Sequence, residues 1–452
     1  MTQCTQESFE FEAHFSRDVV ARFDAGTMTS DGGALLLRET NRRLNLLPRL
    51  AACFQDRRHP WLISHTVEEL VSQRVYALAL GYEDLTDHDR LREDPLFGVL
   101  SGKRRVSQEP LAGKSTLNRL ELGGEAPSRY KKIHYREEAI DELLTRVFLE
   151  AHGQAPEQIV LDLDTTDLPL HGHQEGRFFH GYYDSYCYLP LYIFAGEHLL
   201  CARLRTADQD AAKGSRDEVE RIVRQIRAVW PAVRIIVRAD SGFCRDELMT
   251  WCEDQGVFYV VGMQRNDRLR RMIEPQMQEA ARLHEQTGKP ARVFTEFSYQ
   301  TTTGSWSRSR RVVAKAEQLE GKPNPRFVVT NLNAEEWPAQ QLYEDLYCER
   351  GEMENRIKEQ LSLFAGRVSA ETMRANQLRL YFAAMAYVLM HGLRRLGLKG
   401  TELERAQATT IRLRLLKIGA RIRITARKVW LSLASSYPWQ RLFGEVRAAL
   451  RC

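Results

Sequence analysis

The sequence predicts an α/β protein in which a mixed sheet, flanked by helices, lies between two regions of different composition. Three observations predict it. From residue 156 to residue 263, short β-branched runs alternate with amphipathic helical runs in the order β-β-β-α-β-α-β. The first 155 residues read as mainly helical, and residues 371–452 read as helical and basic. A chain of 452 residues is also too long for one ordinary core, so two or three domains are expected.

The composition is that of a globular protein, with 43% hydrophobic and 28% charged residues. No run approaches the roughly 20 apolar residues of a membrane span, and the polar, acidic N-terminus has no apolar signal core. We therefore expect a cytoplasmic protein with no membrane partner. The eight cysteines form no C-x-x-C pair, so we expect free thiols.

The N-terminal region, residues 1–155, is predicted to begin with one or two strands between Phe9 and Asp24 and to continue as helices. Thr66-Val67-Glu68-Glu69 is typical of a capping box at the start of one of them. The polar, basic segment 107–121 lies between short helices. This arrangement is compatible both with a DNA-binding helix-turn-helix and with helices that only pack together.

The first strand of the central region, residues 159–166, carries carboxylates within an apolar run. At a period of two residues, Asp162 and Asp164 point to one face of the sheet. Carboxylates in a buried strand are costly unless they are paired, hydrogen-bonded or bound to a metal. Asp167, just before Pro169, reads as a turn residue.

Two further carboxylates lie at the end of an apolar strand or on an amphipathic helix, where a buried charge is costly unless it is compensated. Asp240 ends the apolar strand from Val233 and is followed by a Gly turn. Glu354 lies on a helix predicted from about residue 338 to residue 361, where Tyr347, Arg350, Glu354 and Lys358 share one face. Between these two elements, residues 264–335 combine one helical run with polar, strand-like pieces and are predicted to be a mainly β insertion.

Oxygen ligands without His or Cys suit Mg²⁺ or Mn²⁺, and two such ions can activate the attacking oxygen and stabilise the leaving oxygen in phosphoryl transfer. Taken singly, Asp at a strand end is more often a cap, and Glu354 is more often a surface partner of Arg350 or Lys358. The three acidic positions together favour a metal site. His171, His173 and His180 are expected to be polar loop residues and not metal ligands.

These residues resemble the signature of DDE transposases of bacterial insertion sequences. Asp164-Thr165-Thr166 is similar to a D-x-T first motif, and Ala239-Asp240-Ser241-Gly242-Phe243 is similar to the second. Tyr347, Arg350 and Glu354 resemble the Y-R-E-K signature of the cut-and-paste branch that passes through DNA hairpins. That signature has Lys seven residues after the Glu, where this chain has Leu361, so Lys358 is our candidate substitute.

The resemblance implies a ribonuclease-H-like core over residues 156–370 that holds two Mg²⁺ or Mn²⁺ ions at Asp164, Asp240 and Glu354. Asp162 is the alternative first ligand. It also implies that Tyr347, Arg350 and Lys358 grip DNA phosphates. An aromatic of the insertion would trap a flipped base, for which Trp306, in a segment that reads as exposed, is the candidate beside a plain packing role. Arg308, Arg310 and Arg311 would then meet the DNA backbone; without that function they are expected to form a solvated face.

The implied partners are double-stranded DNA, as terminal inverted repeats and target, and a second copy of the chain in a synaptic homodimer associated with the nucleoid. The basic C-terminal region fits such a partner, because nine Lys or Arg and no Asp or Glu lie between Arg405 and Arg441. Two rival functions remain, namely a nuclease on the same core and a catalytically inactive, transposase-derived DNA-binding protein.

Overall fold

The computed structural model describes residues 8–106, 109–124, 128–302 and 304–451, which form two compact units. The central unit comprises Arg136–Leu361 and Ala365–Ala384, and the terminal unit comprises Met1–Tyr135, Ser362–Phe364 and Met385–Cys452. The division differs from the three predicted parts in two ways. The helix α7 (Glu137–Glu150) belongs to the central unit, and the two chain ends make one unit.

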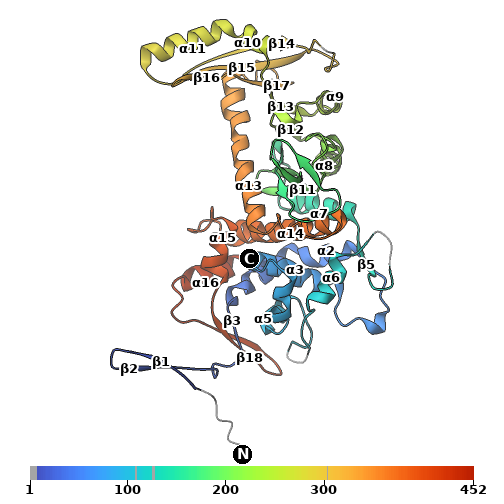
Figure 1. The fold of residues 1–452 in the computed structure, drawn as a ribbon, viewed down its shortest axis with the longest axis vertical. Helices are drawn as coiled ribbons and strands as arrows, with labels where there is room; N and C mark the ends of the chain where they lie inside the picture. The colour runs from blue at the N-terminus through green and yellow to red at the C-terminus, as the bar shows by residue number, and fades with distance from the viewer. Residues whose placement is uncertain (1–7, 107–108, 125–127, 303, 452) are drawn as a thin grey trace, which may run out of the picture. The chain divides into compact units, whose positions relative to one another are not determined.

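The central unit is built on a nine-stranded mixed sheet of order β11-β10-β6-β12-β13-β17-β15-β14, with β16 paired to β15 (Figure 1). Its first strands are β6 (Gln158–Thr165), β10 (Leu191–Ala195), β11 (His198–Arg203), β12 (Arg234–Ala239) and β13 (Phe258–Met263). β10 runs antiparallel to β6 and β11, whereas β12 runs parallel to β6 and β13. With α8 (Ser215–Val229) and α9 (Asp246–Asp254) between strands, the predicted α/β alternation is confirmed.

The two faces of this sheet bury different helices. Ile159, Leu161 and Leu163 of β6 belong to a core that also contains the apolar stripes of α8 and α9. Val160, on the opposite face, packs against a second core that includes Leu342 and Leu346. The predicted two-residue alternation therefore holds, and it directs Asp162 and Asp164 towards the helical segment that begins at residue 339.

That helical segment is not one α-helix, as the sequence predicts, but four consecutive pieces. They are α12 (Ala339–Gln341), a π-helical turn (Leu342–Tyr347), a 3₁₀ turn (Cys348–Arg350) and α13 (Gly351–Ser362). A π-helical turn is wider than an α-helical one and shifts the angular position of every residue after it. Such turns occur often at functional sites.

The segment predicted to be a mainly β insertion with one helical run contains both kinds of structure. Its strands β14 (Ala291–Tyr299), β15 (Arg310–Leu319), β16 (Lys322–Pro323) and β17 (Arg326–Thr330) continue the central sheet, because β17 pairs directly with β13. The helical run forms two consecutive helices, α10 (Asp267–Met272) and α11 (Glu274–Thr287), and α11 packs against β14 and β15 (Figure 1). Pairing covers the edge that β13 would otherwise leave open, which explains why the added strands join the sheet.

The terminal unit is mainly helical. Its helices of four or more residues are α1 (Leu35–Leu44), α2 (Leu46–Ala52), α3 (Val67–Leu80), α4 (His88–Leu91), α5 (Pro95–Leu100), α6 (Lys114–Glu121), α15 (Ala408–Ile411), α16 (Gln440–Ala449) and the second half of α14 (Met373–Gly397). Its strands are β1 (Ser8–His14), β2 (Arg17–Arg22), β3 (Met28–Thr29), β4 (Phe54–Asp56), β5 (Ile133–Tyr135), β18 (Ala420–Ile424) and β19 (Val429–Leu433). The capping box predicted at Thr66 is present.

The helix before the central sheet, α7, begins at Glu137, directly after β5. In the C-terminal part of the chain, residues Arg412–Leu416 form a π-helical turn, and β18 pairs with β19. The buried guanidinium of Arg412 donates to the backbone carbonyls of Ala79 and Ser362. Ser107 and Gln108, the start of the suspected helix-turn-helix segment, lie outside the described residues.

Within the described ranges, no helix has the length and apolar character that a membrane crossing requires.

Candidate active site

Asp162, the first carboxylate of β6, is compensated by a neighbouring strand. Arg238 of β12 lies directly opposite it in the parallel register, and its guanidinium donates from Nε to Oδ1 at 2.5 Å and from Nη2 to Oδ2 at 2.8 Å. Both side chains are 7% exposed. Arg238 also donates to the carbonyl of Leu346, at 2.5 Å, in the π-helical turn. Asp162 thus belongs to a buried bidentate ion pair that joins β6, β12 and the helical segment.

Sequence reasoning missed Arg238, although a signal was present. An arginine within an apolar strand is as costly to bury as an aspartate, and the two residues lie on the same face of adjacent strands. Pairing Arg238 with Asp162 requires the register between β6 and β12, which cannot be read from the sequence.

Asp164, two residues further along β6, has a different environment. Its Oδ1 accepts from the backbone N–H of Thr165 at 2.8 Å, and its Oδ2 accepts from Nη1 of Arg350 at 3.0 Å. Burial raises the pKa of Asp164 to about 6; Arg350 opposes this shift, and the negative charges of Asp240 and Glu354 add to it. Asp164 is therefore a carboxylate whose charge is only partly compensated.

Asp240 is placed next to Asp164 by the sheet. Ala239, the last residue of β12, lies opposite Leu163 of β6, so the two aspartates follow at the same edge of two parallel strands. The Asp240 carboxylate accepts from the backbone N–H of Gly242 at 2.8 Å and so caps the 3₁₀ turn Ser241–Phe243. The cap holds one carboxylate oxygen and fixes the position of the group.

The third element of the site is the helical segment. Arg350 lies between two carboxylates, because its Nη1 contacts Asp164 and its Nη2 is 3.8 Å from Oε1 of Glu354. The Glu354 side chain is 55% exposed and projects from the first turn of α13. Lys358 is exposed one turn further along the same helix.

Tyr347 reaches the same place from the π-helical turn. A Cβ added to Gly262 of β13 would lie 2.5 Å from the Tyr347 hydroxyl oxygen and 2.9 Å from the backbone N of Ser241. The tyrosine hydroxyl therefore lies beside the backbone that follows Asp240, in a space that only glycine leaves open. Burial raises the pKa of Tyr347; Arg350 opposes this shift and Asp240 adds to it.

The predicted metal ligands meet at one end of the sheet but do not form a coordination sphere. No group of three or more His, Cys, Asp or Glu side chains within the described part of the chain lies close enough together to hold a metal ion. Arg350 is the cation that Asp164 contacts. The chemistry of the donors nevertheless fits Mg²⁺ or Mn²⁺, because all are carboxylates and their mutual repulsion helps to keep the pKa of Asp164 raised.

Three residues expected to contact DNA lie elsewhere. Trp306 has the packing role that was the alternative for it, since its side chain is 5% exposed and packs at 85° against Tyr299, with ring centroids 5.7 Å apart. Arg310 is 2% exposed and forms ion pairs with Asp246 and Glu253 of α9, so the expectation that it meets DNA is wrong. The exposed Arg308 is paired with Glu253 and Asp254.

The sequence as a whole matches one protein family. A sequence model of the family described as "Transposase DDE domain group 1" matches residues 11–452. Comparison with curated proteins finds no match. Among solved structures, the chain is similar to a piggyBac transposase synaptic complex with hairpin DNA determined by cryo-EM, with 10% sequence identity and a TM-score of 0.40 over 86% of this chain and 80% of that chain. So distant a likeness says nothing about function, whereas the family match spans nearly the whole sequence. The chain therefore belongs to the DDE transposase domain family.

Proposed function

We propose that the protein is a DNA transposase that cuts the terminal inverted repeats of an insertion sequence and joins them to target DNA. The observation that carries this proposal is the meeting of Asp164, Asp240 and the Tyr347-Arg350-Glu354 series at one end of the sheet, in a chain of the DDE family. The strand order β11-β10-β6-β12-β13, with three antiparallel strands followed by two parallel ones, supports a ribonuclease-H-like core.

In this proposal Asp164, Asp240 and Glu354 hold two Mg²⁺ or Mn²⁺ ions. Such ions supply activation of the attacking oxygen and stabilisation of the leaving oxygen in phosphoryl transfer. Arg350 contacts the Asp164 carboxylate that would hold an ion. With the ions bound, its planar guanidinium would be available to a DNA phosphate, which it suits bidentately. Tyr347 and Lys358 bind neighbouring phosphates.

We assign duplex binding to a basic groove of the terminal unit. The groove, of about 660 Å³, is lined by Arg104, Arg105, Arg427 and Lys428, all of them exposed. Beside it, Trp430 of β19 is 46% exposed and has Lys428 5.1 Å from its ring centroid. Positive side chains beside an exposed aromatic are typical of a nucleic-acid surface.

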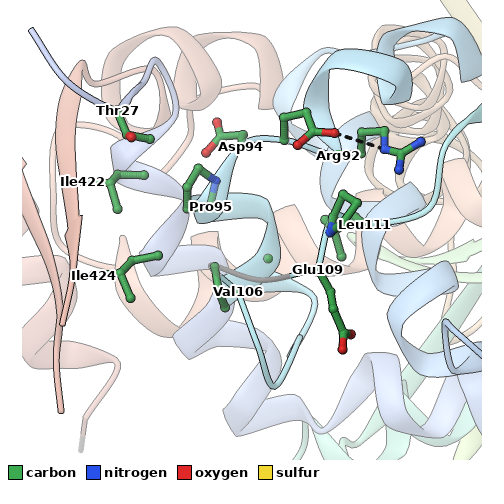
Figure 2. Close-up of a pocket in the computed structure, with 12 residues that line it drawn as sticks. Thr27, Arg92, Asp94, Pro95, Val106, Glu109, Leu111, Ile422 and Ile424 are labelled. Atoms are coloured by element: carbon green, nitrogen blue, oxygen red, sulfur yellow. Dashed lines mark ion pairs between the residues drawn. The ribbon is translucent and has the colours of Figure 1, made fainter. Parts of the chain in front are cut away.

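The neighbouring cavity is a weaker candidate for DNA. Figure 2 shows this cavity, of about 390 Å³, between Ile422 and Ile424 on one side and the segment from Arg92 to Leu111 on the other. It shares Val106 and Ile424 with the basic groove. Its lining includes Glu93, Asp94 and Glu109, and Glu93 pairs with Arg92. The acidic lining would repel phosphates, so the duplex is assigned to the groove alone.

The test is strand cleavage and joining. Purified protein is incubated with linear DNA that carries both ends of its element, with Mg²⁺, Mn²⁺ or EDTA. We expect cut ends and joined products in the presence of metal only, and loss of both with Asp164→Asn, Asp240→Asn or Glu354→Gln. Glu352→Gln is the matched control, because Glu352 is an exposed carboxylate on the same turn of α13.

Each rival function has its own outcome in this experiment. Cleavage without joined products identifies a nuclease. DNA binding without cleavage by the intact protein identifies an inactive, transposase-derived DNA-binding protein. The proposed homodimer is tested by light scattering, in which end DNA should bring two chains together.

A further inference from the structure

A group of exposed aromatic side chains lies on a short hairpin of the central unit. This aromatic hairpin, residues 178–188, consists of β8 (Phe178–His180), β9 (Ser185–Tyr188) and the turn between them. Its exposed side chains are Phe178 at 41%, Phe179 at 53%, Tyr182 at 86% and Tyr186 at 43%. Single exposed apolar residues are normal on a protein surface, whereas four neighbouring exposed aromatics on one short hairpin form a patch that indicates a binding surface.

The exposed rings are arranged as a surface with a positive charge on it. Phe179 and Tyr186 are cross-strand partners, with centroids 5.5 Å apart and an interplanar angle of 74°. The guanidinium of Arg177 lies 3.8 Å from the centroid of the Tyr186 ring. The same guanidinium donates to the carbonyl of Gly172 at 2.7 Å, which holds it in place. The paired rings and the held guanidinium therefore form one continuous surface of the hairpin.

The hairpin is connected on both sides to strands that lie next to Asp164 or follow it directly in the chain. β6 ends at Thr165, and β7 (Leu168–Pro169) follows and pairs with β9. After β9 the chain enters β10, in which Tyr192 lies opposite Asp164. In the turn, Tyr183 packs against the cluster of Cys187, Leu189 and Ala207. Burial raises the pKa of Tyr183 to about 12, and the charges of Asp167 and Asp164 add to the shift.

We propose that the aromatic hairpin binds unpaired bases of the DNA strand whose phosphate lies at Asp164. The proposal rests on the proposed function, which brings a DNA end to this place. Exposed aromatic faces and a planar guanidinium are the groups on which single-stranded bases stack. A paired duplex presents only base edges and phosphates, so the rings select strands that are already open. The other occupant, a second copy of the chain, is an outcome of the test.

The experiment compares two probes in EDTA, so that binding is measured without cleavage. One probe is a blunt duplex of the element's end, and the other carries a few unpaired thymidines at that end. We expect the intact protein to bind the tailed probe more tightly. Tyr182→Ala and the pair Phe179→Ala/Tyr186→Ala should each reduce this preference about fivefold or more, the size expected for a lost stacked base.

Two controls make the result specific. Phe179→Trp/Tyr186→Trp keeps the stacking faces and should retain the preference for the tailed probe. Phe15→Ala removes a ring that is 92% exposed on another hairpin, in the terminal unit, and should change nothing. Thermal unfolding followed by circular dichroism checks that each variant is folded.

Several results would overturn the proposal. The first is equal binding of both probes by the intact protein, and the second is an unchanged preference in the alanine variants while end cleavage in Mg²⁺ persists. Either result leaves the proposed function standing. If the variants instead dissociate a dimer in the absence of DNA, the hairpin is a contact between copies. If the intact protein binds neither probe, both proposals fail.

Discussion

The buried ion pair of Asp162 and Arg238 predicts that Asp162 contributes to the stability of the fold, whereas Asp164, two residues further along β6, does not. Asp162→Leu leaves the Arg238 guanidinium buried, with the Leu346 carbonyl at 2.5 Å and the mostly exposed Glu349 at 3.4 Å as its remaining acceptors. Arg238→Met leaves the Asp162 carboxylate without its two guanidinium bonds. Removing one partner of a buried ion pair costs about 3–5 kcal/mol of the free energy of unfolding.

Replacing both partners has a smaller effect. In Asp162→Leu/Arg238→Met neither charge is left unpaired, and apolar side chains of similar volume are often neutral or stabilising at such places. We therefore expect the double variant to lie within about 1–2 kcal/mol of the intact protein, so that the two single effects are strongly non-additive.

The contrast with Asp164 completes the prediction. Burial raises the pKa of Asp164 to about 6, so removal of its charge by Asp164→Asn should leave the free energy of unfolding nearly unchanged or increase it. Urea unfolding followed by circular dichroism at neutral pH measures all four variants. Additive single effects at Asp162 and Arg238, or a loss at Asp164 as large as that at Asp162, would refute the reasoning.

Three further predictions concern other parts of the chain. Gly262→Ala places a Cβ 2.5 Å from the Tyr347 hydroxyl oxygen. We expect the rate of strand cleavage to fall about 10²-fold while DNA binding persists. Gly262→Ala/Tyr347→Phe removes the hydroxyl and should recover part of the cleavage rate. Arg427→Ala/Lys428→Ala should lower the slope of log K against log salt by up to about 1.8, because two phosphate contacts are lost; an unchanged slope excludes the groove. Burial lowers the pKa of His88 to about 3, and nitrogen atoms of Gln73 and Arg74 lie next to its ring nitrogens. The neutral imidazole therefore contributes fully to the free energy of unfolding above pH 6.5, the pKa of a histidine in the unfolded chain. This contribution is lost as the pH falls below that value. Between pH 7.5 and 5.5 the intact protein should lose about 1.4 kcal/mol more than His88→Asn; equal losses would contradict this.

Much of the core of the central unit could be predicted from local pattern. The two-residue alternation of β6 is enough to separate Leu161 from Asp162, and apolar runs ending in a carboxylate mark the strands that carry Asp164 and Asp240. These features depend on neighbours in sequence, so a single chain reveals them. The extension of the sheet by β14–β17 did not follow, since pairing between β13 and β17 is a long-range contact that strand-like pieces alone do not specify.

The burial of single residues was less predictable. Trp306, among Ser, Thr and Arg, has the composition of an exposed loop, yet Tyr299 and Arg310 enclose it. The aromatic hairpin shows the reverse case, because its apolar residues remain exposed. In both segments the surroundings come from elements distant in sequence, which local composition does not contain.

The sequence by itself determined which carboxylates are expensive to bury, which strands and helix carry them, and which family they resemble. Only the tertiary structure showed that the two aspartates of β6 have different cation partners. The parallel register of β6 and β12 places Arg238 opposite Asp162, whereas the turn from π-helix to α-helix brings Arg350 to Asp164. The physical reason is that compensation of a buried charge depends on which cation lies within about 3 Å of it, and strand register and helix phase set that distance.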